Sequence, residues 1–369
     1  MSKICIISHY ADSLINFRGE LIEGMVDKGY RVKAFAPEPG FKEQINNLGA
    51  EYETIPLDRT GMNPFVDFKT IVSLIRKLRK FDPDIIFSYA IKPVIYGGLA
   101  SRLCGVENIN SLIPGAGVLF KPEKRKSKLF KLVKFLYKLA LKKNNVIFFQ
   151  NPDDQELFQK MGLISAETKS VVVSGSGVNT EYFNYEKPKN DPISFLIMAR
   201  LIEDKGIIEF IEAADMLKDN HPDVKFNILG PFDINPTAIK EDEIKYWEKQ
   251  GVINYLGAAD DVRPYLKECS VFVLPSYYRE GTPRSILEAM STGRAIITTD
   301  SVGCRETVDP GSNGFLVSPR NSKELAEAMK KFINNAELIE KMGRASRKIA
   351  EEKYDVYKVN EKMYKEMGI

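Results

Sequence analysis

Two glutamates eight positions apart lie in the segment whose residue types could most directly bind a ligand. Glu280 stands in a polar stretch after the apolar run at residues 271–274, and Pro283 then opens a predicted helix that carries Glu288. The first-turn N–H groups of a helix lack intrahelical partners and the helix dipole is positive there, so this helix start suits an anion. Two carboxylates for hydroxyl groups, with a phosphate between them, match a nucleotide sugar.

Two cations follow the strand-like run at residues 194–198, namely Arg200 and Lys205. Arginine offers a fork of donors to phosphate oxygens and lysine a point charge, so the pair suits a diphosphate. Taken alone, both cations are better explained as solvated surface charges, and Glu288 as an exposed residue or a helix neighbour of Arg284 at i, i+4. The diphosphate hypothesis therefore requires that the two loops meet at one edge of a sheet.

Short β-rich runs alternate with helical stretches along the whole chain, which is typical of parallel α/β sheets. Because 369 residues exceed what one core supports, we expect two Rossmann-like, doubly wound domains, residues 1–184 and 185–352, facing each other across a ligand-binding cleft. The tail from residue 322 to 367 is predicted to be helical with a break only at Gly343, and residues 353–369 to pack back on the N-terminal domain. The expected strands cover residues 4–7, 31–36, 51–56, 85–88, 109–113, 146–149, 170–173, 194–198, 225–229, 253–256, 271–274, 295–298 and 314–317.

Several function classes are disfavoured by composition. Four scattered cysteines without a C-x-x-C pair and only two histidines indicate neither a zinc site nor a disulfide framework, and favour a reduced, cytoplasmic setting. The N-terminus lacks the pattern of a signal peptide, and no apolar run approaches the ~18 residues of a membrane span. The loop after the first strand lacks G-x-G-x-x-G, which disfavours a dinucleotide enzyme. Asp260 and Asp261 precede a predicted helix start, where N-capping explains them better than a metal.

Residues 193–317 resemble the nucleotide-binding domain of glycosyltransferase family 4, retaining enzymes of the GT-B fold. The resemblance rests on the E-x7-E spacing of Glu280 and Glu288, on Arg200 and Lys205, and on the segment at residues 300–306. It implies that Glu280 faces the donor sugar, Glu288 the ribose, and the two cations the diphosphate, with neither a metal nor another cofactor. By the same resemblance, the remaining donor-binding positions are Gly281, Thr282, Pro283, Ser285, Ile286, Leu287, Gly257 and Ala258.

The N-terminal half resembles bacterial capsular-polysaccharide and glycan-assembly transferases of that family, through residues 9–18, 90–97 and 114–120. Several relatives have a histidine where this chain has Ile91, so no catalytic imidazole is carried over to that position. His9 is the other imidazole candidate, although a lone histidine at a strand end is as often structural. The candidates for the acceptor side are His9, Asn16, Arg18, Lys92, Gly115 and Gly117.

A basic helix is predicted over residues 121–143, which hold ten Lys or Arg and one acid. Six lysines fall within one arc of about 120° and the rest of the surface is largely apolar, more than one core contact requires. Such a helix is suited to an anionic membrane surface. The alternative is a core helix with a solvated lysine stripe. Nucleic acid is not expected, because no exposed aromatic residues alternate with the charges and no nucleic-acid motif is present.

The sequence therefore predicts a metal-independent, retaining glycosyltransferase with two substrates and one surface partner. The donor is expected to be a UDP-sugar that carries a hexose or N-acetylhexosamine, and the acceptor a saccharide linked to polyprenyl diphosphate in surface polysaccharide or glycan assembly. The expected location is the cytoplasmic face of the cell membrane, as a peripheral protein. Two alternatives remain open: a nucleotide-sugar epimerase of the GT-B fold and a non-catalytic, membrane-associated scaffold.

Overall fold

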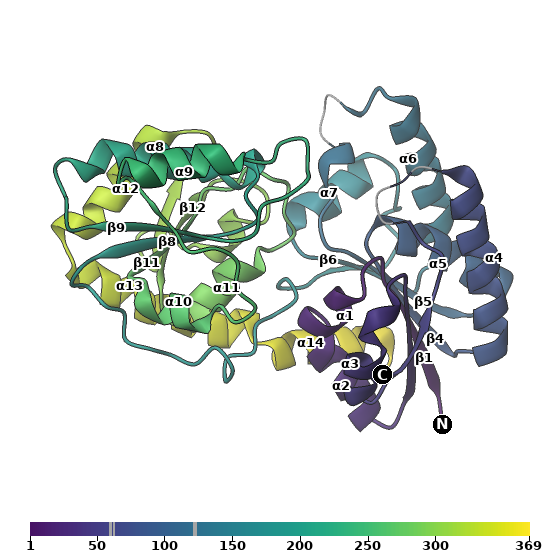
Figure 1. Ribbon diagram of the computed structural model, residues 1–369. Coiled ribbons are helices and arrows are strands. Elements are labelled where there is room, and N and C mark those ends of the chain that lie inside the picture. Colours follow the sequence, from purple (N-terminus) through teal and green to yellow (C-terminus); the bar gives the residue numbers. More distant parts are fainter. Residues whose placement is uncertain (59–60, 62, 121–123) are drawn as a thin grey trace. The chain divides into compact units, whose positions relative to one another are not determined.

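The strands form two parallel sheets, one in each of two units, in the computed structural model of the chain (Figure 1). The structure describes residues 1–58, 61, 63–120 and 124–369. Unit 1 comprises residues 1–176 and 357–369, and unit 2 comprises residues 177–356. The chain thus enters unit 2 earlier than the expected position 184/185, inside a glycine-rich turn where Gly175 and Gly177 both have positive φ.

The sheet of unit 1 has seven parallel strands in the order β3-β2-β1-β4-β5-β6-β7. Ile4 pairs with Val32 on one side and with Ile85 on the other, so β1 is central. Its strands are β1 (Lys3–Ile7), β2 (Arg31–Ala36), β3 (Glu51–Thr54), β4 (Ile85–Tyr89), β5 (Asn108–Ile113), β6 (Val146–Phe149) and β7 (Ser170–Val172).

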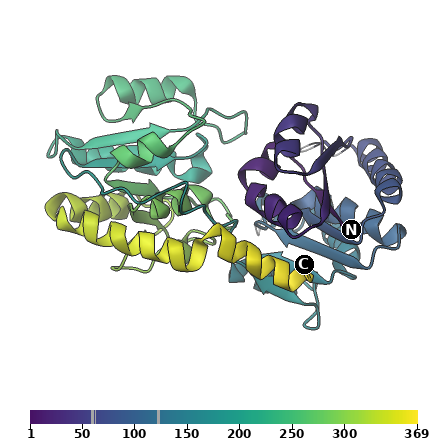
Figure 2. The same ribbon diagram turned by 90° about the horizontal axis from the view of Figure 1, so that it is seen from below.

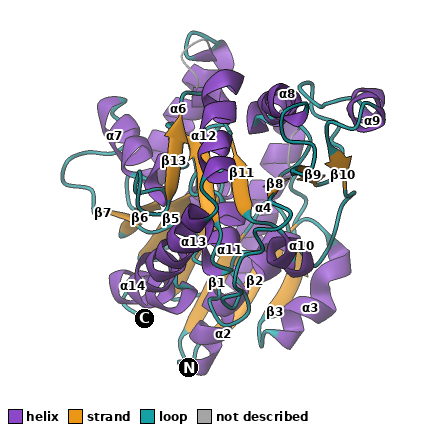
Figure 3. Cartoon of the chain, turned by 90° about the vertical axis from the view of Figure 1, so that its left-hand side faces the viewer, coloured by secondary structure: helices purple, strands orange, loops and turns teal. Residues whose placement is uncertain are grey.

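Alternate residues of the central strand of unit 1 face two separate cores. Ile4 and Ile6 belong to the core under α1 (Asp12–Asn16), α2 (Gly19–Asp27), α3 (Lys42–Asn47) and α14 (Val356–Met367). Cys5 and Ile7 belong to the core under α4 (Pro64–Phe81), α5 (Ile91–Leu103), α6 (Lys128–Leu141) and α7 (Pro152–Lys160). Figure 3 shows strands in orange with purple helices against them. The helices α4, α5 and α6 therefore form one layer on one face of this sheet.

The sheet of unit 2 has six parallel strands in the order β10-β9-β8-β11-β12-β13. They are β8 (Ser194–Met198), β9 (Lys225–Leu229), β10 (Asn254–Tyr255), β11 (Val271–Leu274), β12 (Ala295–Thr299) and β13 (Gly314–Val317). The helices are α8 (Ile207–Lys218), α9 (Glu241–Lys249), α10 (Arg263–Glu268), α11 (Arg284–Ser291), α12 (Ser322–Asn334) and α13 (Glu337–Ile349). Each predicted strand is present, most within two residues of its expected bounds.

The C-terminal tail is helical, but its predicted break at Gly343 was wrong. The breaks fall at Asn335 and Asp355, and Gly343 lies inside α13. A Cβ at Gly343 would lie 2.2 Å from the carbonyl oxygen of Gly293, so this glycine permits close packing rather than a turn. The last helix, α14, belongs to unit 1, where Tyr364 Oη donates to the carbonyl oxygen of Leu21 at 2.9 Å (Figure 2, yellow).

Candidate functional site

The loops that carry the predicted donor residues meet at one edge of the sheet of unit 2. Strands β8 and β11 are hydrogen-bonded neighbours and parallel, so their carboxyl ends share that edge. Arg200 and Lys205 follow β8, and Glu280 follows β11. The Lys205 ammonium group donates a short hydrogen bond to Glu280 Oε1, so the two loops are in direct contact.

The Lys205–Glu280 ion pair is largely buried, with side chains 15% and 14% exposed. Ser276 Oγ donates to the same Glu280 oxygen at 3.3 Å, and the ammonium group lies 5.6 Å from the centre of the Tyr278 ring. The Tyr278 N–H donates to the carbonyl oxygen of Asp204 at 2.8 Å, which joins the backbones of the two loops. The two loops are therefore joined both by a buried ion pair and by a backbone hydrogen bond.

Arg200 faces a partner that the sequence did not predict. Its Nη1 lies 2.6 Å from Asp233 Oδ2, while the arginine side chain stays 45% exposed. Burial raises the pKa of Asp233, but the Asn235 N–H and Arg200 outweigh it, so the pKa lies below its usual value. A sequence signal existed: Asp233 stands three residues after Gly230, at the carboxyl end of the strand beside β8. Arg200 thus already forms an ion pair with Asp233, and a ligand phosphate would share the guanidinium group with that carboxylate.

Glu288 lies on α11 and pairs with Arg284, the helix neighbour that the alternative interpretation of the sequence predicted. Arg284 Nε donates to Glu288 Oε1 at 2.9 Å, one helical turn apart. Burial raises the pKa of Glu288, and the neighbouring guanidinium group opposes that effect only in part. A helix-turn ion pair and a ligand contact are compatible, because a carboxylate has a second oxygen to offer. A role for Glu288 at the ribose stays a prediction.

The first turn of α11 offers fewer backbone N–H groups to a ligand than the sequence predicted. The N–H groups of Ile286 and Leu287 donate to the carbonyl oxygen of Pro283, at 3.1 and 3.4 Å. In the described part of the chain the Ser285 N–H, one position earlier, donates no backbone hydrogen bond of this kind, and Ser285 is half-buried. A phosphate at this helix start would therefore accept most directly from the Ser285 N–H. The N–H groups of Ile286 and Leu287 could reach it only if each also kept its hydrogen bond to the Pro283 carbonyl oxygen.

The turn at Gly281 and Thr282 is fixed by the segment after β12. A Cβ at Gly303, where φ is +85°, would lie 2.0 Å from the Gly281 carbonyl oxygen. Ser301 Oγ donates to the carbonyl oxygen of Ser276 at 2.8 Å, on the same loop as Glu280. Gly281, Thr282 and Pro283 are all buried. The donor turn is thus held from two sides, as a preorganised site requires.

Gly257 and Ala258 lie at the same sheet edge, after β10. Gly257 has φ +76°, and its carbonyl oxygen accepts a 2.8 Å hydrogen bond from Gly230 N–H. Ala258 is exposed at this edge.

The start of α10 is capped close to where the sequence predicted. Asp261 Oδ1 accepts from the Arg263 N–H at 3.0 Å, although Val262 is the N-cap residue of α10. Asp261 thus satisfies a donor at the helix start, as predicted for a capping residue, but from one residue before the observed N-cap.

Two predicted acceptor-side residues of unit 1 gather around Tyr89. The His9 ring lies edge-on at 6.5 Å, and the Arg18 guanidinium carbon lies 5.4 Å from the centre of the Tyr89 ring. Tyr89 Oη is 2.8 Å from Ser13 Oγ, which is 3.0 Å from Ser8 Oγ. Burial raises the pKa of Tyr89, so its hydroxyl stays protonated. The group forms a buried polar cluster at the carboxyl ends of β1 and β4.

Among the residues that the structure describes, Lys92 and Asn16 form no hydrogen bond or ion pair with this cluster. Lys92 Nζ lies 2.9 Å from Asp67 Oδ1 and donates to the Gly61 carbonyl oxygen at 2.6 Å, so it ties the start of α5 to that of α4. Asn16 is exposed at the end of α1. Ala90, just before α5, has φ +71° and ψ +163°, a conformation that costs about 1–3 kcal/mol in a residue with a Cβ. Such strain commonly marks a functional turn.

The loop at Gly115 and Gly117 follows β5 at the same edge of the unit 1 sheet. The Ala116 N–H donates to Asp154 Oδ2 at 3.0 Å, and this carboxylate is fully buried. Gly117 has φ +71°, which favours glycine. Asp154 was not singled out by the sequence, because nothing local links α7 to a loop thirty-eight residues away.

Outside residues 59–60, 62 and 121–123, the side chains include no cluster of three His, Cys, Asp or Glu able to hold a metal.

Comparison with known proteins agrees with the predicted family. Residues 178–349 match the family model described as glycosyl transferases group 1, and residues 3–151 match the one described as glycosyl transferase 4-like. An N,N'-diacetylbacillosaminyl-diphospho-undecaprenol alpha-1,3-N-acetylgalactosaminyltransferase from Campylobacter jejuni is 30% identical over 91% of this chain and 90% of that protein. A UDP-Gal:alpha-D-GlcNAc-diphosphoundecaprenol alpha-1,3-galactosyltransferase from Escherichia coli is 30% identical over 68% and 66%.

A solved structure shows the same fold. Anabaena Alr3699/HepE in complex with UDP has a TM-score of 0.80 over 99% of both chains, at 19% identity. The two parallel Rossmann-like sheets are those of the GT-B fold. With two family models matched in succession and a relative 30% identical along nine-tenths of its length, the chain belongs to the group 1 and family 4-like glycosyltransferases.

Proposed function

We propose that this glycosyltransferase moves a hexose or N-acetylhexosamine from a UDP-sugar to a saccharide linked to polyprenyl diphosphate. The observation that carries the proposal is the contact of Lys205 with Glu280, which brings the predicted diphosphate and sugar residues to one edge of unit 2. Relatives 30% identical to the chain are named for undecaprenyl-diphosphate-linked substrates, and a protein of the same fold binds UDP. These similarities support the donor and acceptor classes.

In the proposed reaction, the bond between the anomeric carbon and the diphosphate oxygen breaks. Positive charge then grows on the sugar, and negative charge on the leaving diphosphate. Arg200, Lys205 and the Ser285 N–H stabilise that diphosphate, without a metal or another cofactor. Glu280 orients the donor sugar, and Glu288 accepts hydrogen bonds from the ribose. The site needs no protein nucleophile for this chemistry.

We further propose that the anomeric configuration is retained. The acceptor hydroxyl attacks from the face that the diphosphate leaves and gives its proton to a diphosphate oxygen, so the new bond forms on the same side. The acceptor is expected at the carboxyl ends of β1, β4 and β5 in unit 1. There the Tyr89 cluster with His9 and Arg18, and the loop of Gly115 and Gly117, supply polar groups.

Helix α6 is proposed to hold unit 1 on an anionic membrane surface. It begins at Lys128, with Ser127 as its N-cap, and residues 121–123 of the predicted helix lie outside the described part of the chain. Its inward side buries Phe130, Tyr137, Ala140 and Leu141. Its outward side leaves Leu129, Leu132, Phe135 and Leu139 between 37% and 63% exposed. The core contact thus leaves an apolar stripe uncovered, beside the lysines.

Helix α6 itself contains no Asp or Glu beside its lysines. Elsewhere lysines pair with glutamates one turn away, for example Lys160 with Glu156 at 2.7 Å. No such pair involves Lys128, Lys131, Lys134 or Lys138 among the residues that the structure describes. Unpaired cations beside exposed leucines fit lipid phosphates, which supports a peripheral location at the cytoplasmic membrane face.

No helix in the described ranges is long and apolar enough to cross a bilayer.

A donor screen with nucleotide release as the readout tests the transferase proposal. Release of UDP from UDP-sugars is measured with and without an undecaprenyl-diphosphate-linked saccharide, together with the anomeric form of the product. We expect release that depends on the acceptor, and its loss in Lys205→Met but not in Lys225→Met, a lysine at the opposite end of the sheet. Conversion of the donor sugar without acceptor would favour an epimerase, and no turnover with any pair would refute the proposal.

Vesicle sedimentation tests the role of α6. Replacing Lys128, Lys131, Lys134 and Lys138 with glutamate is expected to release the protein from vesicles that contain phosphatidylglycerol, because each cation contributes about 1 kcal/mol near an anionic surface. Unchanged binding would mean that α6 is a core helix with a solvated stripe, as the alternative interpretation holds.

A further inference from the structure

Helix α4 exposes two phenylalanines in its first turn. Phe65 is 80% exposed and Phe68 is 67% exposed, although the helix buries Leu74, Leu78 and Phe81 on its inner side. The first turn is ordered: Asn63 caps it by accepting from Phe65 N–H at 3.0 Å, and Asp67 pairs with Lys92 of α5. The two rings are therefore presented to the outside by a fixed helix start.

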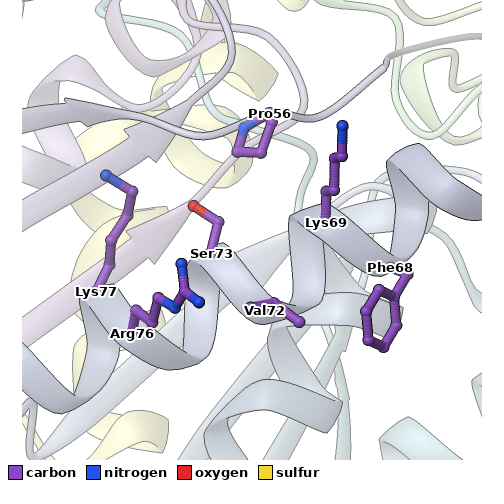
Figure 4. Close-up of a pocket in the computed structure, with 7 residues that line it drawn as sticks. All are labelled: Pro56, Phe68, Lys69, Val72, Ser73, Arg76 and Lys77. Carbon is purple, nitrogen blue, oxygen red and sulfur yellow. The ribbon is translucent and has the colours of Figure 1, made fainter.

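A basic groove of about 570 Å³ lies beside Phe68 on the same helix (Figure 4). Lys69, Ser73 and Arg76 follow one another at i, i+4 and i+7, so all three lie along one face of α4. Lys77 at the end of the groove is paired with Glu53. No acidic partner of Lys69 or Arg76 is found in the described ranges of the chain. The groove thus offers two uncompensated cations and a hydroxyl group beside apolar Phe68 and Val72.

Helices α4 and α6 flank α5 in the layer that covers one face of the unit 1 sheet. Between them, a second groove of about 790 Å³ runs over the end of α5. Its lining includes the apolar Ile71, Leu99, Leu103 and Leu139 and the charged Arg102, Lys143 and Glu107. Leu103 is 65% exposed. Exposed apolar side chains of all three helices therefore belong to one layer, the α4–α6 face; Figure 1 shows the three helices.

We propose that the α4–α6 face is the membrane-binding surface of unit 1, with Phe65 and Phe68 inserted among lipid chains and the groove of Lys69 and Arg76 occupied by a lipid phosphate. The inference deepens, and rests on, the proposed attachment of this enzyme to an anionic bilayer. A bilayer is the occupant that fits, because it places phosphate and hydrocarbon side by side over the width of three helices. A nucleic acid fits less well, because its bases could stack on the two phenylalanines but the exposed leucines of the same face, such as Leu103 and Leu132, offer no aromatic surface for stacking.

This surface has a consequence for the acceptor. In a parallel sheet, helices α4, α5 and α6 all begin at the carboxyl edge, and the loop of Gly115 and Gly117 lies at the same edge. Phe65, Phe68, Leu129 and Leu132 belong to the first turns of α4 and α6. The bilayer thus lies beside the end of unit 1 where the acceptor is proposed to bind. A polyprenyl-linked acceptor can then reach that edge while its chain stays in the membrane.

Three pairs of substitutions in the full-length enzyme test the α4 contact. We expect Phe65→Ser with Phe68→Ser, and separately Lys69→Glu with Arg76→Glu, to weaken binding to vesicles of phosphatidylcholine and phosphatidylglycerol by about tenfold or more. The matched control is Met216→Ser with Tyr246→Ser, an exposed apolar pair in unit 2, which should bind as the wild type does. Equal binding by the wild type and both α4 variants would overturn the inference.

Insertion depth gives a second, independent measurement. Phe68→Trp adds one tryptophan to a chain that has only Trp247, in unit 2. Brominated lipid chains should quench the added emission. Absence of quenching on bound protein would refute insertion of α4.

Activity separates the failure of this inference from that of the proposed function. The α4 variants should keep wild-type turnover on a water-soluble, short-chain acceptor and lose it on the full-length acceptor in vesicles. If the wild type binds vesicles through α4 but turns over no donor and acceptor pair, the transferase proposal fails and the membrane surface stands. If all α4 variants use the vesicle-bound acceptor as the wild type does, the transferase stands and this inference is refuted.

Discussion

Replacing Lys205 with methionine is expected to have two separable effects, one on stability and one on turnover. The substitution keeps a long, unbranched side chain but removes the cation beside Glu280. Both side chains of this ion pair are about one-seventh exposed, so Glu280 would stay nearly buried after losing the ammonium group that balances its charge. Removing one partner of a buried pair costs about 3–5 kcal/mol, and the residual exposure favours the lower end, about 3 kcal/mol.

Urea unfolding measures the first effect, because the single tryptophan, Trp247, reports on unit 2. With a slope of about 2 kcal/mol per molar urea, a loss of about 3 kcal/mol lowers the midpoint by about 1.5 M. Adding Glu280→Gln removes the buried negative charge. The double variant Lys205→Met, Glu280→Gln should therefore recover most of the lost stability.

Turnover is expected to respond differently. If Lys205 stabilises the leaving diphosphate, its loss lowers kcat by about 100- to 1,000-fold, as for other preorganised charge-stabilising donors. Restoring stability with Glu280→Gln should not restore kcat, measured as UDP release with a saturating acceptor. A double variant that is both stable and near wild-type in kcat would refute the reasoning, because Lys205 would then serve only to neutralise Glu280.

Four further outcomes are expected. Burial raises the pKa of Glu288, so donor affinity should begin to fall on acidification at a pH above the ordinary glutamate range. The folded state also keeps this proton to a higher pH than the unfolded state, so the free energy of unfolding should fall as pH rises from the ordinary to the raised pKa. Glu288→Gln should abolish both dependences. Asp233→Asn removes a carboxylate 2.6 Å from the exposed Arg200, so calorimetry should show UDP binding tighter by up to about fivefold; weaker binding would instead make Asp233 a positioning residue. Ala90→Gly should raise the free energy of unfolding by about 1 kcal/mol, since relief of strain at φ +71° exceeds the entropic cost of glycine; a decrease would contradict that balance. Gly303→Ala should lower stability and donor binding together in thermal and UDP titrations, because its Cβ would collide with the Gly281 carbonyl oxygen; wild-type values would show that the donor turn can shift freely.

Local patterns were sufficient for the elements of the fold. The runs at residues 146–149 and 271–274 are continuously apolar and bounded by turns, and each is a strand where predicted. Gly343 was misread because glycine is ambiguous in sequence: it can end a helix or permit close packing. Only the carbonyl oxygen of Gly293, fifty residues away in the chain, decides for close packing.

The sequence by itself determined the parallel α/β class, the glycosyltransferase family and which polar residues follow strand ends. Those properties depend on residue type and on spacing along one segment, and both can be read from the chain. The tertiary structure decided the partners: Lys205 with Glu280, Arg200 with Asp233, Lys92 with Asp67, and Ala116 with Asp154. Each pair joins segments between twenty-five and seventy-five residues apart, and the packing of strands and helices, rather than any local preference, brings the two groups within hydrogen-bonding distance.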